Sequence, residues 1–512
     1  MEKRILLAVI PVVIVATAAL LLVFNPFTPS ETQTAEDKPR GLRLTWKRND
    51  VAHTMAVTWK TNRSDSGDTV LYDTVSRNGD PDLYSYSTQG INHNFSGNYG
   101  GEEGLNISYP VIIHEVELTG LFPNTTYYFI CGGEEGGWSG ERAFKTAPLT
   151  RSNVRFVAGG DNRDGPEERD KISQTMSQYD PDFVLHNGDI VNRGYRQDQW
   201  DDFFNHTDAY FVGSNNLTLP IIPCIGNHET PYWQYLAQFA LPHNELWYSL
   251  DWGPDIHIIV LTSENYPTSK SWTDQVTWLE RDLQIHRYFP WKIVMFHKNV
   301  FYAGHPELDE AFTYGWVALF DKYHVDLVIN GHSHNYWRTN PINYTDSNPD
   351  PTLPPSAPDN TYNKTQPFYE NGTMYIVTGG WGAPLRYFTP GGWWTAYNRT
   401  LYNFVVVDIF QNGTLYLQAK NDTGETFDEA WIHKTLPQTI GMELAGPPTE
   451  KTHKPTNPAS REHAPKAATW NLGSTNPFVM SFAGVTFAHD DLRRRVKLIR
   501  RRLMLHSKLK RV

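Results

Sequence analysis

The chain has 512 residues, 39% hydrophobic and 20% charged, a composition that excludes wholesale disorder and allows roughly two to four domains. The net charge is −11, and basic residues gather in 436–512, so the rest of the chain is strongly acidic. An acidic body repels phosphate backbones, which argues against a nucleic-acid partner. With two cysteines, Cys131 and Cys224, a disulfide framework is excluded, and both are expected to be buried free thiols.

Residues 5–24 predict a transmembrane anchor. They are uncharged and mostly apolar, and at about 1.5 Å per residue they span roughly 30 Å, one hydrocarbon core. Lys3 and Arg4 precede them, so the positive-inside rule places the N-terminus in the cytoplasm and the body outside. A cleaved signal peptide, which gives a secreted protein, is the alternative, but no convincing cleavage site follows Phe24. A buried soluble helix is disfavoured because such helices are rarely apolar on all faces.

Residues 25–41 are polar and are expected to form a flexible linker. Beyond them, Asn-x-Ser/Thr sequons recur through the chain and suggest a glycosylated, exported surface. They include Asn62, Asn106, Asn124, Asn216, Asn363 and Asn421. The prediction is a single-pass protein of the cell membrane with an extracellular body.

Residues 42–148 predict an all-β domain, because short alternating runs are separated by Gly, Asn, Asp and Ser. The segment Leu121-Phe-Pro-Asn-Thr-Thr-Tyr127 resembles the corresponding pattern of fibronectin type III domains. In that resemblance Tyr127 is a corner tyrosine whose hydroxyl bonds a nearby backbone group, and Trp46 and Trp59 are core residues. No catalytic cluster occurs here, so a structural or spacing role is expected.

Residues 153–435 alternate apolar strand-like runs with helical patterns. Strands are predicted within 154–160, 182–188, 221–227, 256–262, 292–298, 325–331 and 374–380. Residues 272–286 predict a helix with Val276, Leu279 and Leu283 on one face, and 402–421 predict a strand pair.

Residues 436–512 form a Pro- and Thr-rich segment, expected to be disordered, followed by a basic tail. Leu492, Val496, Ile499 and Leu503 share one face of a possible amphipathic helix that could lie on an acidic membrane. A solvated tail without a specific role is the alternative.

Five short motifs follow strand candidates in order. They are Gly160-Asp161-Asn162-Arg163, Gly188-Asp189-Ile-Val-Asn192, Gly226-Asn227-His228-Glu229, Met295-Phe-His297 and Gly331-His332-Ser-His334. Ligands of open α/β sheets bind at the carboxyl ends of strands, so these side chains are expected to meet. Carboxylate, amide and imidazole donors suit two ions such as Zn, Mn or Fe, which one carboxylate can bridge. Any single motif is more often a turn, and the combination carries the prediction.

The motifs resemble those of calcineurin-like metallophosphoesterases, and specifically purple acid phosphatases with a fibronectin-like N-terminal domain. The resemblance covers about residues 42–435. It implies an α+β fold class: a four-layer α/β sandwich preceded by an all-β sandwich and, here, by the N-terminal transmembrane helix. It also implies a phosphate ester substrate, monoesters being favoured, and hydrolysis by a metal-activated hydroxide. The oligomeric state is not specified.

Ligand roles follow from the same resemblance. Asp161, Asp189 and His334 are expected to hold the first metal ion, and Asp189, Asn227, His297 and His332 the second. The two ions are divalent or of mixed valence. His228 is expected to contact the phosphate and to act as the acid.

Two positions depart from the family pattern. Asn192 stands where purple acid phosphatases carry an iron-binding tyrosine, so a tightly held ferric ion and the purple colour are not expected; Asn192 or water is expected to complete the first metal site. Arg163 stands where other metallophosphoesterases carry histidine. It either binds the substrate phosphate or points to solvent or Asp164, and the two readings weigh equally.

The remaining candidates are weaker. His305 lines the pocket or lies on a surface loop. The aromatic residues Trp381, Tyr387, Phe388, Trp393 and Trp394 are expected to pack rather than to bind substrate. His186, His257 and His324 are interpreted as structural. The competing functions are a non-catalytic surface binding module with a degenerate metal site, a phosphodiesterase of the same fold, and a structural envelope protein.

Overall fold

The computed structural model describes residues 38–63, 67–99, 108–264, 270–301, 313–345, 348–352, 360–364, 372–387 and 394–436. All of them belong to one compact unit, 1–439. The predicted anchor 5–24, nearly all of the linker, His305 and the basic tail lie outside the described residues. Within the described ranges, no helix is long and apolar enough to cross a membrane.

The N-terminal part is β-rich. One sheet has the order β1-β2-β6-β5, and a second has the order β4-β3-β7-β8 with β9 also paired to β7. The strands are β1 (Arg40–Thr45), β2 (Met55–Thr61), β3 (Thr69–Asp73), β4 (Tyr86–Gln89), β5 (Ile91–Asn98), β6 (Ser108–Leu118), β7 (Thr126–Gly133), β8 (Gly137–Trp138) and β9 (Arg142–Lys145). A short 3₁₀ turn, η2 (Pro81–Leu83), precedes β4.

Several core residues of this part follow the sequence prediction. Trp46 and Trp59 are buried. The Tyr127 hydroxyl accepts a hydrogen bond from the Phe122 backbone N–H at 2.9 Å, which fixes the corner before β7. Cys131, like Cys224 further along the chain, is a buried free thiol.

Two large sheets form the rest of the described unit. The first has the order β12-β11-β10-β23-β24-β25-β20 and the second β13-β14-β15-β16-β21-β17-β22. The first contains β10 (Val154–Gly159), β11 (Phe183–His186), β12 (Ile221–Pro223), β20 (Thr361–Lys364), β23 (Asn403–Phe410), β24 (Thr414–Asn421) and β25 (Thr426–Lys434). The second contains β13 (Tyr248–Trp252), β14 (Ile256–Val260), β15 (Trp291–Met295), β16 (Leu327–Asn330), β17 (Tyr336–Thr339), β21 (Met374–Thr378) and β22 (Thr395–Arg399), and β18 (Asn343–Thr345) pairs with β19 (Asn348–Thr352) outside both sheets.

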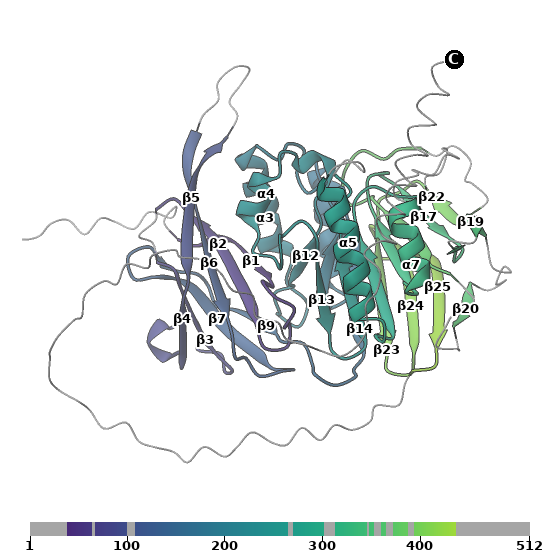
Figure 1. Ribbon diagram of the computed structural model, residues 1–512. Helices are drawn as coiled ribbons and strands as arrows, with labels where there is room; N and C mark the ends of the chain where they lie inside the picture. Colours follow the sequence, from purple (N-terminus) through teal and green to yellow (C-terminus); the bar gives the residue numbers. More distant parts are fainter. Residues whose placement is uncertain are drawn as a thin grey trace, which may run out of the picture. The chain divides into compact units, whose positions relative to one another are not determined.

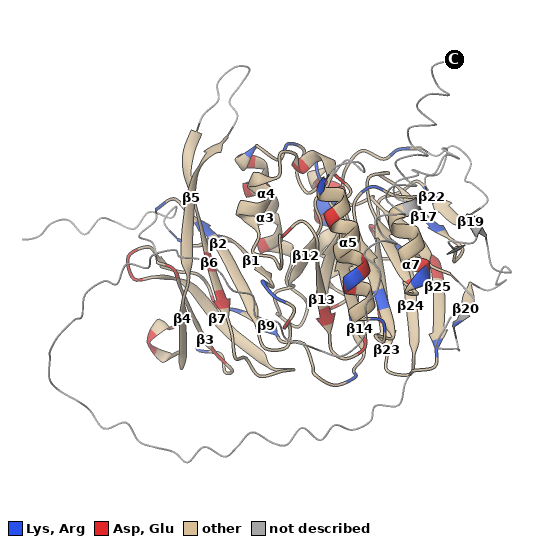
Figure 2. Cartoon of the chain, in the orientation of Figure 1, with Lys and Arg blue, Asp and Glu red and all other residues tan. Residues whose placement is uncertain are grey.

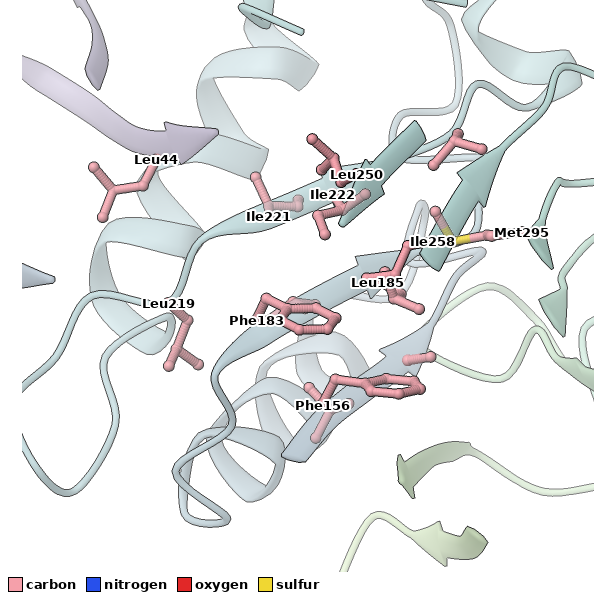
Figure 3. Close-up of a cluster of buried hydrophobic side chains, with 14 of the residues drawn as sticks. Leu44, Phe156, Phe183, Leu185, Leu219, Ile221, Ile222, Leu250, Ile258 and Met295 are labelled. Atoms are coloured by element: carbon pink, nitrogen blue, oxygen red, sulfur yellow. The ribbon is translucent and has the colours of Figure 1, made fainter. Parts of the chain in front are cut away.

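The two sheets pack face to face because their strands are apolar on both sides. In β14, Ile258 joins the core shared with the first sheet, whereas Ile259 joins a separate core with α5 and α7. Figure 3 shows this shared core, in which Phe156 and Phe183 of the first sheet approach Ile258 and Met295 of the second. This pattern is expected for sheets that are covered on both faces.

Helices cover the outer faces of the sheets. They are α2 (Pro166–Ser177), α3 (Gln197–Tyr210), α4 (Trp233–Gln238), α5 (Lys270–Ile285) and α7 (Ala318–Lys322), with short turns η3 (Asn227–Glu229) and η4 (Thr313–Val317). Leu279 and Leu283 of α5 are buried on the predicted face. The layers therefore run helix, sheet, sheet, helix, a mixed α+β architecture of four layers.

The β-rich part contacts α3 and α4 through buried polar bonds. Arg43 in β1 donates from Nε to the Gln238 carbonyl at 2.6 Å, and the Thr45 hydroxyl donates to the Ala240 carbonyl at 2.6 Å. Lys60 in β2 pairs with Asp201 of α3. Figure 1 shows β1 and β2 beside these helices. Acidic and basic residues are interspersed along the described helices and strands (Figure 2).

Candidate metal centre

The motif residues lie just beyond the strands that were predicted to carry them. Asp161 follows β10, Asp189 follows β11 and Asn227 follows β12, three parallel neighbours in the first sheet. His297 and His332 follow β15 and β16, parallel neighbours in the second. Since the sheets face each other, these strand ends bring the side chains together, as predicted.

The backbone turns sharply at three of these residues. Asp161, Asp189 and His332 have φ angles of 58°, 52° and 70°, in the left-handed region that few non-glycine residues adopt. Gly160 allows the close approach before Asp161, because a Cβ atom there would stand 1.5 Å from Asn187 Oδ1. The chain therefore leaves each strand abruptly and directs these side chains into the space between the sheets.

One group of possible ligands comprises Asp189, His297 and His332, whose ligating atoms lie within 4.8 Å of one another. His297 donates from Nδ1 to the Asn187 carbonyl at 2.9 Å, so its Nε2 points inward. That nitrogen is 3.2 Å from Asp189 Oδ1 and 3.2 Å from Asn227 Oδ1. Asn227 therefore adds an amide oxygen to this group.

The other group, expected to hold the first metal ion and called the first ligand group below, shares Asp189 and adds Asp161 and His334, again with ligating atoms within 4.8 Å. His334 donates from Nδ1 to the Pro384 carbonyl at 2.8 Å, which turns Nε2 toward Asp161 Oδ1 at 3.4 Å. Asp161 is fully buried, and its Oδ1 has no hydrogen-bond partner in the part of the chain that the structure describes. A buried oxygen of this kind is costly unless a cation compensates it.

These residues fit two metal ions. In both groups, imidazole nitrogens lie beside carboxylate oxygens, an arrangement that a metal ion between them can stabilise. The oxygen and nitrogen donors suit Zn, Mn or Fe, and Asp189 belongs to both groups, as a bridging ligand must.

The pKa values of the same residues reflect this crowding. Burial, together with the nearby Asp189, raises the pKa of Asp161 to about 7. Burial alone would lower the pKa of His297, but Asp189 and Asp161 outweigh it and raise the pKa to about 10. Burial lowers the pKa of His332 to about 3 and that of His334 to about 4, so both are neutral and present lone pairs at neutral pH.

His228 lies beside the ligand groups and outside them. Its Nδ1 donates to the Asn192 carbonyl at 2.7 Å, and its Nε2 is 3.8 Å from Asp189 Oδ2. The side chain is 27% exposed, unlike the buried His297. One ring nitrogen is thus fixed by the backbone, and the other faces the open side of the centre.

Arg163 points into the centre. Its side chain is 8% exposed and pairs with Asp164, so the predicted alternative of an Asp164 partner is observed, whereas orientation to solvent is not. It also donates from Nη1 to Asn192 Oδ1 at 3.3 Å and from Nη2 to His334 Nε2 at 3.2 Å. The Asn192 oxygen, predicted to complete the first metal site, therefore faces a guanidinium.

Glu229 is a functional candidate that the sequence analysis missed. It is fully buried, and its carboxylate accepts hydrogen bonds from the backbone N–H groups of Asp189, Val191 and Gly226 at 2.8–3.0 Å. Burial and Asp189 raise its pKa to about 8. Its position directly after Asn227 and His228 in one motif was the available signal. Glu229 holds the Asp189 turn in place.

The remaining candidate residues differ in burial. Trp381 and Trp394 are buried and pack, as predicted, whereas Tyr387 is 91% exposed. Phe388, Trp393 and His305 lie outside the described residues. His186 is buried against Trp381 and belongs to the core.

A third cluster of Asp and His lies away from the centre, at Asp251, His257, Asp282 and His286; we call it the His257 cluster. Three of its members meet the distance requirement for a metal ion. Yet the His257 and His286 rings are stacked, 3.9 Å apart and 16° from parallel. Ring lone pairs lie in the ring planes, and nearly parallel planes do not meet at one ion. The structural interpretation of His257 therefore stands.

Comparisons with known proteins agree with this geometry. The family model "Purple acid Phosphatase, N-terminal domain" matches residues 39–146, and "Calcineurin-like phosphoesterase" matches residues 123–336. The chain is 30% identical over 360 residues to "Acid phosphatase type 7" of Homo sapiens, covering 63% of this chain and 77% of the relative. The relative of the same name in Danio rerio is 28% identical over 431 residues, covering 75% and 89%.

Solved structures share the fold. A purple acid phosphatase, PPD1 from yellow lupin seeds, superposes with a TM-score of 0.63 at 22% identity, covering 78% of this chain and 74% of that one. PhoD superposes with a TM-score of 0.51 at 11% identity, covering 78% and 93%. The fold of the family implies a dinuclear metal centre. Sequence, fold and paired ligand groups together show that the chain belongs to the purple acid phosphatase family of metallophosphoesterases and is a phosphoric ester hydrolase.

Proposed function

We propose that the chain hydrolyses phosphomonoesters with two ions of Zn, Mn or Fe, held by the two ligand groups that share Asp189. The observation that carries this proposal is the position of His228 Nε2, 3.8 Å from the shared carboxylate, outside both ligand groups. When bound, the ions activate a water molecule and polarise the phosphoryl oxygens. The named relatives are acid phosphatases, which favours monoesters over diesters.

His228 supplies the proton for the leaving alcohol. Its Nδ1–H is committed to the Asn192 carbonyl, so the ring cannot rotate freely, and Nε2 faces the open side. A proton on Nε2 can pass to the leaving oxygen as the bond to phosphorus breaks.

Replacing His228 with Ala tests this role. We expect a loss of about 10²–10⁴-fold in kcat with an alkyl phosphate, the range of general acid catalysis. The loss should be much smaller with p-nitrophenyl phosphate, because p-nitrophenolate leaves without being protonated. Equal losses with both esters would assign His228 to phosphate binding instead.

The reaction itself is tested with p-nitrophenyl phosphate and bis-p-nitrophenyl phosphate. The purified protein is stripped of metal and reloaded with Zn, Mn or Fe, from acidic to neutral pH. We expect metal-dependent turnover that favours the monoester, and no turnover by His297→Ala. A preference for the diester would select the phosphodiesterase alternative, and a folded protein inactive with every metal would select the non-catalytic module.

We also propose that the described unit lies outside the cell, anchored by residues 5–24. The apolar run and the preceding basic residues support this orientation. Sequon asparagines are exposed and open to glycosylation at Asn94, Asn124, Asn205, Asn216, Asn398 and Asn412. Surface labelling of intact cells should reach the protein, and N-glycosidase treatment should lower its apparent mass. Protection from the label would overturn the orientation.

A further inference from the structure

Arg163 contacts the same atoms that the first metal ion requires. Its Nη2 is 3.2 Å from His334 Nε2, its Nη1 is 3.3 Å from Asn192 Oδ1, and its Nε is 3.5 Å from Asp189 Oδ2. Its Nε is buried without a hydrogen-bond partner among the described residues, although it is aimed at that carboxylate. The guanidinium therefore faces two donor atoms of the first ligand group, on His334 and Asp189, and the Asn192 oxygen that was predicted to complete the site.

The hydrogen bond between Arg163 and His334 excludes a metal ion from His334 Nε2. His334 donates its Nδ1–H to the Pro384 carbonyl, so its Nε2 carries the single lone pair of the ring. Arg163 donates a hydrogen bond into that lone pair. A metal ion needs the same lone pair, so the hydrogen bond and the metal–nitrogen bond cannot coexist.

Charge adds to this conflict. A guanidinium remains positive at all relevant pH values, and at 8% exposure it is poorly screened from a second cation beside it. The group formed by Asp189, His297 and His332 has its own inward nitrogen on His297, bound to Asp189 and Asn227 and receiving no hydrogen bond from Arg163. The two groups thus differ at their inward imidazole nitrogens: a guanidinium donates a hydrogen bond to that of His334 in the first group.

Asp164 offers the guanidinium another position. It already pairs with Arg163 Nη1, and its side chain is 30% exposed, on the outer side of the centre. Withdrawal toward Asp164 frees His334 and Asn192 while keeping the charge of Arg163 compensated.

We propose that Arg163 competes with the first metal ion, so that the two sites bind metal unequally and the first site fills only when the guanidinium leaves His334 and keeps its pair with Asp164. Arg163 is thus a residue that sets metal stoichiometry. The inference rests on the dinuclear chemistry proposed above, and it deepens that chemistry by naming which ion is exchangeable.

The test measures Mn²⁺ binding to the metal-stripped full chain. Binding is monitored by calorimetry and by the electron paramagnetic resonance signal of free Mn²⁺. The wild type should show one tight and one weak site. Arg163→Met keeps the length of the side chain and removes the charge, and it should tighten the weak site by about tenfold or more while leaving the tight site unchanged. His334→Ala in the Arg163→Met background should abolish the tightened site.

Arg193→Met is the matched control, because Arg193 is an exposed arginine of the neighbouring loop and its loss changes the net charge equally. Arg193→Met should leave the Mn²⁺ dissociation constants of both sites unchanged. Arg163→Lys keeps the charge without the planar fork and should leave the first site weak, which guards against a folding defect of Arg163→Met. Two equal sites in the wild type, or no tightening in Arg163→Met, would overturn the proposal.

Hydrolysis of p-nitrophenyl phosphate is followed in the same samples. Absent turnover with both sites filled would refute the proposed function alone, since the binding constants are measured independently of activity.

Discussion

The metal centre and the His257 cluster are built from the same residue types with opposite hydrogen-bond patterns. In the centre, Asp161 Oδ1 has no hydrogen-bond partner among the described residues, although His334 Nε2 lies 3.4 Å away. In the His257 cluster, both ring nitrogens of His257 face carboxylates, Asp251 at 2.6 Å and Asp282 at 2.8 Å. The centre thus leaves a buried carboxylate oxygen for an external cation, whereas the His257 cluster pairs its carboxylates with its own imidazoles. The direction of the hydrogen bonds, rather than composition, separates a metal site from an internal ion pair.

The largest effect is expected from Asp189→Ala, which removes the ligand common to both groups. Mutating a residue that supports a metal ligand lowers metal affinity or activity by about 10–100-fold. Losing a ligand that both ions share should therefore lower kcat/KM by more than about a thousandfold. Metal analysis of the purified variant should show that both ions are lost. Retention of one tightly bound ion would show that the two groups do not share this carboxylate.

In the His257 cluster, the corresponding test is the substitution Asp282→Asn. It leaves His257 and His286 without the buried carboxylate that faces both of them, and breaking a buried ion pair costs about 3–5 kcal/mol of unfolding free energy. Urea denaturation measures this loss. Metal content and kcat at a permissive temperature should match the wild type, and a loss of bound metal would mean that this cluster, too, holds an ion.

A smaller effect is expected from Glu229→Gln, which weakens the support of the Asp189 turn. Gln keeps the shape of the side chain but replaces one acceptor oxygen with a donor, which opposes one of the backbone N–H groups. We expect kcat to fall by about 10–100-fold through weaker metal binding. Excess metal should restore much of the activity, a recovery not expected of Asp189→Ala.

The smallest effect is a pH dependence of stability that belongs to the His257 cluster. Burial opposes charge on His286, but the facing Asp282 and Asp251 raise its pKa above the ordinary value of about 6.5. The stabilisation from His286 is therefore complete below about pH 6.5 and is lost as the pH rises through the raised value.

Asp282 acts in the opposite direction. Burial raises its pKa, but bonds from His257 and His286 outweigh burial and hold the pKa below its usual range. Its contribution is present above about pH 3.9 and is lost in stronger acid. The free energy of unfolding of the wild type, minus that of His286→Gln, should be largest between these limits and decline as the pH rises above about 6.5. A difference that stays constant with pH would show that His286 is neutral throughout.

Local patterns in the sequence predicted much of this fold. Apolar runs such as 154–160 and 325–331 became β10 and β16 because their residues are buried on both faces. The polar strand β5 (Ile91–Asn98) was missed, since its side chains are largely exposed and it lies at the edge of its sheet. It pairs with β6 through backbone hydrogen bonds, which a hydrophobic pattern in the sequence does not predict.

The centre was predicted at the level of residue type and strand end. Asp161, Asp189, His297 and His332 were each expected at the position where they lie, because parallel strands end at a common edge. The side-chain directions were not accessible from the sequence. Which nitrogen of His334 faces inward depends on the Pro384 carbonyl, 50 residues away, and the orientation of Arg163 depends on Asn192 and His334.

The bonds from Arg43 and Thr45 to the Gln238 and Ala240 carbonyls have a consequence for the evolution of this architecture. A chain that began at residue 153 would retain every metal ligand but would leave these two carbonyls, close behind the turn that carries Asn227 and His228, without their buried donors. A buried carbonyl without a hydrogen-bond donor destabilises the fold, so the catalytic part depends on the β-rich part for its stability. The two parts are expected to be lost or duplicated together.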